Sequence, residues 1–396
     1  MSWLWKGALT CLVLPSLMGS AEAGPVGGTR STSTDLHRCH LMEKGRAYLP
    51  NKSPAVVAKL VSDDRVHRAV LDQKAICSPV VVAALAKRRV PIVIEPYWRW
   101  NPQTGASCIA RLPKTVCGLI VSRKWRAPEL RILAKLTHLE ALQVDGIRAQ
   151  DLPILSGLTK LQELQFRFIS TNSGVAQLVT QFRALRKLVF YWVPVTDGDL
   201  SQLAGLTQIR HLTLRATKIT GTGLAALHKL THLRELMVDH AKSFGDAALA
   251  TVAGFKDLER LRITSTGITD AGLAHLSGLT LLQSLDLSGN KRLTPHGLVH
   301  IGRLSGLESL KLPPALITTA SLEHLTSLRR LRELSLPDKV KTDAGLAVLA
   351  RLPALRKLWL RERPITDKGL AHLVGHRGLQ TLSLSRTKIT NKGLAS

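Results

Sequence analysis

The chain has 396 residues, and its 55 Lys and Arg residues outnumber its 28 Asp and Glu residues to give a net charge of +27. A field of this sign attracts acidic partners and anionic surfaces in general and identifies none of them. Hydrophobic residues make up 45% of the chain and aromatic residues only 4%. This composition fits a large soluble protein with few aromatic residues for a platform on which nucleic-acid bases stack.

Residues 1–23 have the pattern of a secretory signal peptide. Lys6 supplies the positive start, residues 7–18 form the apolar stretch, and residues 21–23 are a small-x-small cleavage site. A membrane-spanning helix needs about 20 apolar residues, so this stretch is short for an uncleaved anchor, which is the alternative interpretation. We therefore expect an exported protein that is periplasmic, at the cell surface or secreted, with a flexible leader at residues 24–34.

Residues 35–129 carry no readable repeat, and we predict that they form an irregular N-terminal cap of degenerate units. The pattern favours a helix over residues 78–87, a strand over 90–95 and another strand at 119–121, and Pro128 marks the start of a further helix. Terminal units of a repeat array are normally atypical, because the leucines at the end of the array must be shielded from water.

Four cysteines of this cap remain after signal removal, and they predict two disulfides in an exported chain: Cys39, Cys77, Cys108 and Cys117. We prefer the pairing Cys39–Cys77 with Cys108–Cys117, because each bond then closes a local loop. Buried free thiols are the alternative. A zinc site at His37, Cys39 and His40 is less favoured, because no Cys-x-x-Cys pair completes it.

From residue 130 to residue 396 one pattern repeats. The first leucine-type position of each unit recurs every 24 or 25 residues, at Leu158, Phe182, Leu206, Leu230, Phe255, Leu279, Leu304, Leu328, Leu352 and His376. Within a unit, apolar residues two apart, as at Leu261 and Ile263, predict a short strand. Thr269 or Asp270 then caps a short helix that carries Leu273 on its buried face. One such unit cannot bury its own leucines, so it must stack on its neighbours.

The phrase Ile-Thr-Asp-x-Gly-Leu-x-x-Leu, at residues 268–276 and again at 365–373, resembles the leucine-rich repeats of the cysteine-containing subclass, which occur in F-box adaptors and in bacterial repeat proteins. The resemblance implies an α/β solenoid with a curved parallel sheet on the concave side and short helices on the convex side. Where that subclass carries Cys or Asn after the strand, this chain has Thr217, Thr266, Thr387 and, once, Asn290. The Thr hydroxyls can bond nearby backbone groups. No F-box-like segment is evident, so the resemblance implies a binding scaffold.

Side chains that alternate with the buried strand residues should point away from the core on the concave side. By this register the candidate partner-binding residues are Arg167, Tyr191, Arg215, Met237, Asp239, Arg262, Asp286, Lys357, Trp359 and Arg361. Trp359 between two basic residues is the preferred anchor, because Trp, Tyr and Arg dominate interface hot spots. The alternative is a solvated face with one isolated aromatic residue.

Catalytic and cofactor motifs are absent from the sequence. It contains no His-Glu-x-x-His, no Gly-x-Ser-x-Gly, no phosphate-binding Gly-rich loop and no tandem Cys-x-x-Cys. His211 and His240 fall near concave strands, and neither has a repeated acid or serine partner. We therefore predict a protein that is not an enzyme and that has no catalytic residue, cofactor or metal.

Two functions follow from these features. The first is an exported scaffold that binds a protein partner on its concave face, where mixed charges suit a protein better than a uniform polyanion. The second is binding of an acidic polysaccharide or an anionic cell surface through the net charge; nucleic acid is disfavoured by the signal peptide and the scarcity of aromatic residues.

The last unit runs to Leu394 without a polar capping segment after it. Terminal units usually need such a segment for solubility, so we expect this end either to fray or to be covered by a second copy in an end-to-end homodimer.

Overall fold

The structure is a computed structural model that describes residues 46–49, 52–63, 65–66, 68–71, 73–88, 92–96, 107–122, 125–170, 174–313, 318–335, 342–360, 364–376 and 378–394. The chain divides into two units, residues 1–38 and 39–396, and only the second contains described residues. The predicted signal peptide and leader, and His37, Cys39 and His40, lie outside the described part.

The strands of the second unit form a single 15-stranded parallel sheet in which each strand pairs with the next one along the chain. They are β1 (Arg46–Tyr48), β2 (Arg68–Leu71), β3 (Ile92–Pro96), β4 (Val116–Val121), β5 (Ala141–Asp145), β6 (Glu163–Arg167), β7 (Lys187–Tyr191), β8 (His211–Arg215), β9 (Glu235–Asp239), β10 (Arg260–Thr264), β11 (Ser284–Asp286), β12 (Ser309–Lys311), β13 (Glu333–Ser335), β14 (Lys357–Trp359) and β15 (Thr381–Ser383).

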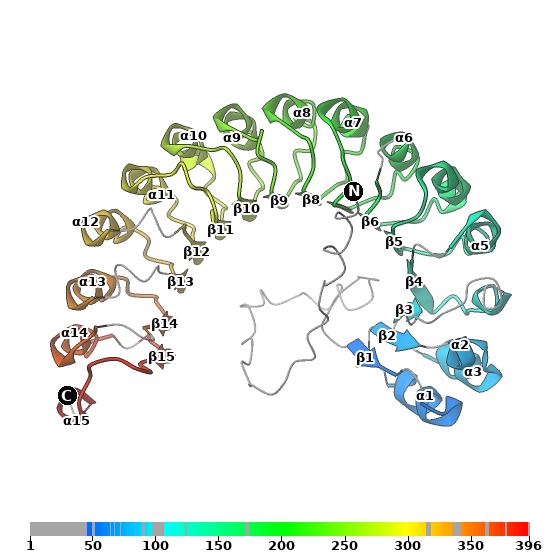
Figure 1. The fold of residues 1–396 in the computed structure, drawn as a ribbon, viewed down its shortest axis with the longest axis horizontal. Helices are drawn as coiled ribbons and strands as arrows, with labels where there is room; N and C mark the ends of the chain where they lie inside the picture. The colour runs from blue at the N-terminus through cyan, green and yellow to red at the C-terminus, as the bar shows by residue number, and fades with distance from the viewer. Residues whose placement is uncertain are drawn as a thin grey trace, which may run out of the picture. The chain divides into compact units, whose positions relative to one another are not determined.

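Helices follow most strands and lie on the outer side of the arc that the sheet forms (Figure 1). The α-helices are α1 (Pro54–Val61), α2 (Gln73–Cys77), α3 (Pro79–Ala86), α5 (Ala127–Leu133), α6 (Val175–Val179), α7 (Asp197–Gln202), α8 (Gly221–Ala225), α9 (Asp246–Val252), α10 (Asp270–Ala274), α11 (Leu298–Ile301), α12 (Thr319–Leu322), α13 (Asp343–Leu349), α14 (Asp367–Ala371) and α15 (Asn391–Leu394). The 3₁₀ segments are η2 (Ala149–Gly157), η3 (Leu203–Gly205), η4 (His275–Gly278), η5 (Pro295–Gly297) and η7 (Glu323–Leu325).

The predicted solenoid is confirmed, and its core is a stack of identical positions. Leu212, Leu236, Leu261 and Leu285 stand side by side in β8–β11, each at most 1% exposed. Leucines from α10 and its neighbours pack behind them, so each unit buries its apolar residues only when the next unit is present. Because each unit depends on its neighbours for burial of its apolar residues, the units form one rigid sheet.

The Thr-Asp-x-Gly-Leu phrase links several helices to the next one along the chain. Thr269 is the N-cap of α10, and both its N–H and its hydroxyl donate to the Asp246 carboxylate of α9, at 2.7 and 2.6 Å. The same bonds join Asp197 to Thr220, Asp343 to Thr366 and Asp367 to Thr390. The Asp side chain fits because a Gly, here Gly272, leaves no Cβ in its way. We call this set of contacts the aspartate ladder.

Asn290 occupies the position after β11 where most other units carry an apolar or Thr side chain. It is fully buried, and its amide donates to the carbonyls of Ile263 at 2.7 Å and Leu287 at 2.8 Å. The equivalent Thr387 hydroxyl donates to the Leu384 carbonyl, as predicted. The buried Thr217 hydroxyl differs, since it has no partner within the described part of the chain.

The first strands of the described chain belong to the same sheet as the repeats. The predicted helix at residues 78–87 is confirmed as α3 with Ser78 as N-cap, and the predicted strands at 90–95 and 119–121 correspond to β3 and β4. The boundary between cap and array at residues 129 and 130 stays a prediction. Among the described residues no helix is both long and apolar enough to cross a membrane.

The described chain ends on a unit that is less buried than the others. Leu382 and Ile389 are only half-buried, and Leu394 is 65% exposed. His376 replaces the usual leucine here and contacts the carbonyl of Leu352 through Nε2 at 2.6 Å. The end-to-end homodimer, predicted from the missing capping segment, stays a prediction.

Candidate functional site

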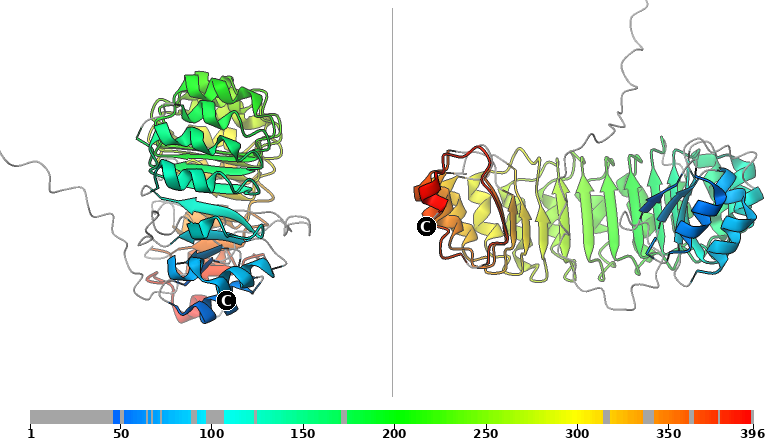
Figure 2. Two further views of the ribbon diagram at one scale, coloured as in Figure 1. Left: turned by 90° about the vertical axis from the view of Figure 1, so that its right-hand side faces the viewer. Right: turned by 90° about the horizontal axis from the view of Figure 1, so that it is seen from below.

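The right panel of Figure 2 shows the strands of the inner face of the sheet. By their register, the side chains that alternate with the buried leucines form three rows across these strands. The first row contains Glu163, Lys187, His211, Glu235, Arg260, Ser284, Ser309, Glu333 and Lys357. The second contains Gln165, Val189, Thr213, Met237, Arg262, Asp286 and Lys311, and the third contains Arg167, Tyr191, Arg215, Asp239 and Thr264. Because adjacent strands lie about 4.8 Å apart, neighbouring side chains of a row are close enough to contact each other.

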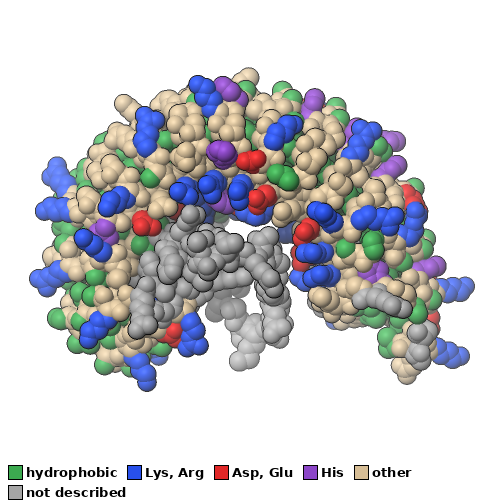
Figure 3. All heavy atoms as spheres, turned by 180° about the vertical axis from the view of Figure 1, so that it is seen from behind, with side chains coloured by type: hydrophobic (Ala, Val, Ile, Leu, Met, Phe, Trp, Pro, Cys, Tyr) green, Lys and Arg blue, Asp and Glu red, His purple; other side chains and the backbone are tan. Residues whose placement is uncertain are grey.

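Opposite charges pair along and between these rows. Lys187 lies 2.9 Å from Glu163, and the Arg260 guanidinium lies 3.2 Å from Glu235. Arg262 donates to Asp239 at 2.9 Å. Figure 3 shows Lys and Arg side chains beside Asp and Glu side chains along the inner rim of the arc. The register of the repeat therefore produces a network of ion pairs.

The acids of this network lie deeper than the bases. The Glu163 side chain is 2% exposed and Lys187 is 33% exposed. Asp239 and Arg262 differ in the same way, at 4% and 41%. Asp286 and Lys311 follow, at 15% and 59%, while Glu333 and Lys357 are the exception with similar exposures. Because Lys and Arg side chains are longer than those of Asp and Glu, they extend past their partners, and the face presents cations outermost.

The pKa of Glu235 shows how strongly this network stabilises the charged form of its carboxylates. Burial opposes ionisation of the Glu235 carboxyl, but the hydrogen bond from His211 and the charge of Arg260 outweigh burial and lower its pKa from 4.5 to about 2. The ring nitrogen Nδ1 of His211 lies 3.0 Å from Glu235 Oε2. The carboxylate is therefore charged at neutral pH and fixes the direction of the Arg260 side chain above it.

We expect Glu235→Gln to lower the free energy of unfolding at pH 6 by about 1–3 kcal/mol, because a depressed carboxyl pKa stabilises the folded state. This stabilisation is complete above pH 4.5 and is lost as the pH falls toward 2. Urea unfolding of both proteins across this range should therefore show a difference that shrinks on acidification. Glu308→Gln, which removes an exposed pair with Arg332, should change little. A Glu235→Gln difference that does not depend on pH would contradict the argument.

An arginine–tyrosine–arginine stack stands in the third row. The guanidinium carbons of Arg167 and Arg215 lie 4.9 and 4.7 Å from the ring centroid of Tyr191. Phe168 meets the Tyr191 ring edge-on at 5.3 Å. Cation–π contacts of this kind hold long arginine side chains in one place without neutralising their charge.

A shallow hollow of about 140 Å³ lies over β9–β12, next to this stack along the face. It is lined by Glu235, Met237, Arg260, Leu261, Arg262, Ser284, Asp286 and Lys311. Three basic side chains rim it, and Met237 supplies an apolar surface that can adapt to a ligand.

The repeat geometry agrees with comparisons to known proteins. The family model described as a leucine-rich repeat region matches residues 126–392, which is most of the chain. The chain belongs to the leucine-rich repeat family.

Solved structures similar to this leucine-rich repeat protein include an internalin (inlF) from Listeria monocytogenes, with 19% identity, a TM-score of 0.44 and coverage of 86% of this chain and 90% of that one. A second is internalin C2 (inlC2) from the same organism, with 20% identity, a TM-score of 0.41 and coverage of 52% and 83%. No curated protein matches the sequence of this leucine-rich repeat protein.

The structure brings together most of the partner-binding residues predicted from the sequence. Arg167, Tyr191, Arg215, Met237, Arg262 and Asp286 occupy neighbouring positions on β6–β11. Lys357 lies on β14, farther along the array, and pairs with Glu333. Trp359 follows it in the same strand, but its side chain and the whole of Arg361 lie outside the described residues, so the predicted anchor stays a prediction.

One predicted residue needs correction. Asp239 was expected to be exposed on the inner face, and the structure buries it. Its carboxylate accepts hydrogen bonds from Arg262 and, at 2.6 Å, from the Thr264 hydroxyl. Asp239 therefore positions Arg262 and is not available to a partner.

Two exposed aromatic residues were missed by the sequence analysis. Phe168 and Trp192 each follow the last residue of a strand and are 53% and 55% exposed. The prediction used the alternation of buried and outward side chains within a strand, and these two residues lie beyond the strand end. The available signal was a large aromatic residue, in two successive units, directly after the charged or aromatic residue that ends the strand.

The disulfide pairing preferred from the sequence is wrong. Cys77 is bonded to Cys108, with their Cα atoms 4.9 Å apart, and Cys117 is also disulfide-bonded. Cys77 ends α2 in the unit of β2, and Cys108 lies after β3 in the next unit. Stacking brings residues of successive units together, so the bond joins units and does not close the short loop from Cys108 to Cys117.

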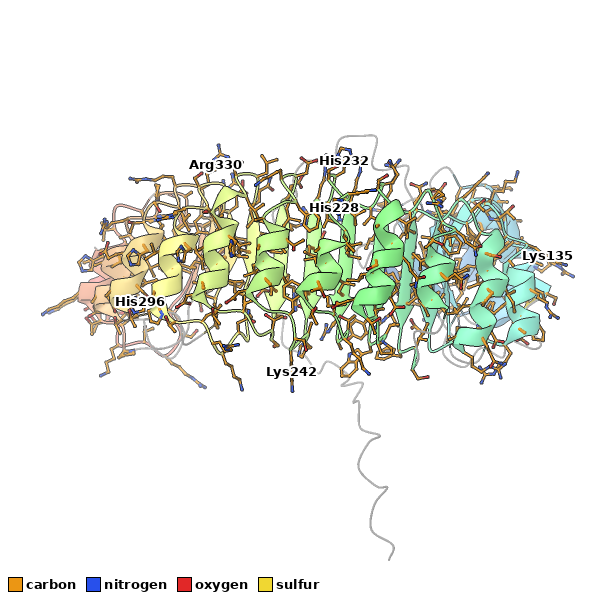
Figure 4. All side chains as sticks on the ribbon, turned by 90° about the horizontal axis from the view of Figure 1, so that it is seen from above. Lys135, His228, His232, Lys242, His296 and Arg330 are labelled. Carbon is orange, nitrogen blue, oxygen red and sulfur yellow. A yellow bond between two sulfur atoms is a disulfide. The ribbon has the colours of Figure 1, made fainter. Side chains whose placement is uncertain are left out.

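The described residues contain no group of three or more His, Cys, Asp or Glu that could hold a metal ion. His211 contacts Glu235, as described above, and His240 has a backbone N–H that donates to the Thr264 carbonyl at 2.9 Å. Other histidines, including His228, His232 and His296, lie on the outer surface or its rims (Figure 4).

Proposed function

We propose that this leucine-rich repeat protein is an exported, non-enzymatic scaffold that binds a protein partner on the inner face of its sheet. The observation that carries the proposal is the layering of charges on that face, where bases are held outermost by acids beneath them. Cations fixed at separate points select a partner whose acidic groups match their spacing. A face that is already rigid also loses little entropy when it binds.

Export is supported by two independent features. The N-terminal 23 residues have the pattern of a signal peptide. The bond between Cys77 and Cys108 is of the kind that persists in oxidising compartments such as the periplasm or the extracellular space. The Ile-Thr-Asp-x-Gly-Leu phrase further supports placing these repeats in the cysteine-containing subclass.

Site-specific crosslinking tests the proposed face. A photoreactive amino acid is placed at Thr213, in the second row on β8, or at Val299, on the outer helix α11. We expect cells that make the Thr213 protein to yield a discrete protein adduct after irradiation, and cells that make the Val299 protein to yield none. Equal adducts from both positions, or none from Thr213, would contradict binding at the inner face.

Salt separates a protein partner from the alternative, an acidic polymer or anionic surface. Binding that rests on many phosphate-like contacts falls by about 10³-fold or more between 50 and 200 mM salt, whereas a partly apolar protein interface loses less. An adduct at Thr213 that persists at high salt supports the protein partner. An adduct that consists of polysaccharide or lipid and disappears at high salt supports the alternative.

A further inference from the structure

Phe168 and Trp192 stand at one side of the inner face in a backbone conformation that large residues avoid. Their φ angles are both 55°, in the left-handed region where bulky side chains are rare and strained. Their N–H groups donate to the carbonyls of Tyr191 and Arg215 at 2.9 and 3.0 Å. These bonds continue the contacts between units and hold the conformation in place.

The fold itself does not need an aromatic residue at this position. The equivalent residues of neighbouring units also have positive φ, and they are Gly146, Ala216, His240, Ser265 and Gly289. His240 here and Arg386 in the last unit, together with these small residues, show that the backbone conformation does not require an aromatic side chain. More than half of each aromatic side chain is exposed, so Phe168 and Trp192 add strain and gain little from burial. Strain held in this way is typical of functional sites.

The two arginines beside these rings differ from the others on the face. Arg260 and Arg262 donate to carboxylates of the preceding strand. Arg167 and Arg215 lie against the Tyr191 ring, and within the described residues neither contacts a carboxylate. A guanidinium stacked on a ring keeps its in-plane N–H donors, which suit a carboxylate in two-point contact.

We propose that Arg167, Phe168, Tyr191, Trp192 and Arg215, here called the aromatic–arginine patch, bind a segment of a protein partner in which an acidic residue adjoins a large apolar residue. The carboxylate is taken by the guanidinium edges, and the apolar side chain lies on the Phe168 and Trp192 rings. Trp, Tyr and Arg are the residue types enriched at energetic hot spots of protein interfaces. This inference rests on the proposed function, because it assigns the partner's chemistry at the same face.

The test uses the full chain and a displayed library of random peptides as the probe. We expect peptides selected on the wild-type protein to be enriched in Asp or Glu next to Trp, Phe, Tyr or Leu. For the best of them, Arg167→Gln and Arg215→Gln should each raise Kd at least tenfold. Arg330→Gln, the same change on the rim of the outer surface (Figure 4), should leave Kd unchanged.

Trp192→Gly separates binding from structure. Glycine accepts positive φ without strain, so this variant should keep or raise the melting temperature while it raises Kd for the same peptide at least tenfold. A merely structural tryptophan would instead lower the melting temperature on removal. Dextran sulfate, a polyanion without apolar groups, should compete weakly with the peptide.

Three results would overturn the inference. The first is selection of peptides without acidic residues, or of no peptides at all. The second is a peptide Kd that is unchanged in Arg167→Gln and Trp192→Gly. The third is strong competition by dextran sulfate for the wild-type protein. A Thr213 adduct that persists in Arg167→Gln and Trp192→Gly would leave the inner-face function intact and remove only the patch. Absence of the Thr213 adduct in the protein without these substitutions removes the proposed function as well.

Discussion

Gly272→Ala should lower the free energy of unfolding by about 2–4 kcal/mol, although alanine is the better helix former. A Cβ at this position would stand 2.8 Å from Leu249 Cδ1 and closer still to Asp246 Oδ1. The Asp246 carboxylate would have to leave, and the N–H and hydroxyl of Thr269 would lose their acceptor. Urea unfolding gives the size of the effect, and hydrogen exchange should place the loss of protection at α9 and α10.

Gly375→Ala is the matched control, because nothing lies within 4 Å of the Cβ that it would add. The φ angle of Gly375 is not positive, so alanine is accepted there, and the same chemical change should leave stability unchanged or raise it by up to about 1 kcal/mol. If both variants lost the same stability, the aspartate ladder would not be the reason for glycine in the repeat.

The repeat made the sheet predictable from the sequence. Leu261 and Ile263 are two apart in one unit and recur in its neighbours, so alternation defines the inner face and the 24-residue period defines which residues stand side by side. The parallel pairing of Arg260 with Ser284 and of Arg262 with Asp286 follows from these two periods alone. For the same reason, the positions of Tyr191 and Arg215 on the inner face could be predicted.

Depth within the face could not be predicted, because it depends on side-chain length and on the neighbouring strand. The register points both Asp239 and Arg262 away from the core, yet one is buried under the other. Register assigns a side chain to a face, and only packing decides which of two paired groups is outermost. The apparent mixture of charges on this face therefore conceals an outer layer of bases.

The disulfide and the exposed aromatics were missed for related reasons. Spacing along the chain favoured short loops, whereas Cys77 and Cys108 meet because stacking brings one unit against another. Phe168 and Trp192 lie one residue beyond the strand, where the backbone turns to positive φ and the alternation rule no longer applies. In both cases, contacts between stacked units determine the position of the side chain.

Asn290→Leu should lower the free energy of unfolding by about 3–5 kcal/mol, the larger of the two effects. Strands β10 and β11 pair only as far as Arg262 and Asp286, so the next carbonyl, that of Ile263, is bonded by the Asn290 amide. The side-chain oxygen also accepts from the N–H and hydroxyl of Thr266, at 2.9 and 2.8 Å. Leucine has the same number of side-chain heavy atoms and replaces none of these bonds, and each buried polar group left without a partner costs about 1–3 kcal/mol.

Thr217→Val is the control at the equivalent position of an earlier unit. The Thr217 hydroxyl is buried and makes no hydrogen bond within the described part of the chain, so removing it should leave stability unchanged or raise it. Urea unfolding of both variants measures the contrast between equivalent positions of two units. If Asn290→Leu were as harmless as Thr217→Val, the carbonyls of Ile263 and Leu287 would have other donors, and the buried amide would not be what joins these units.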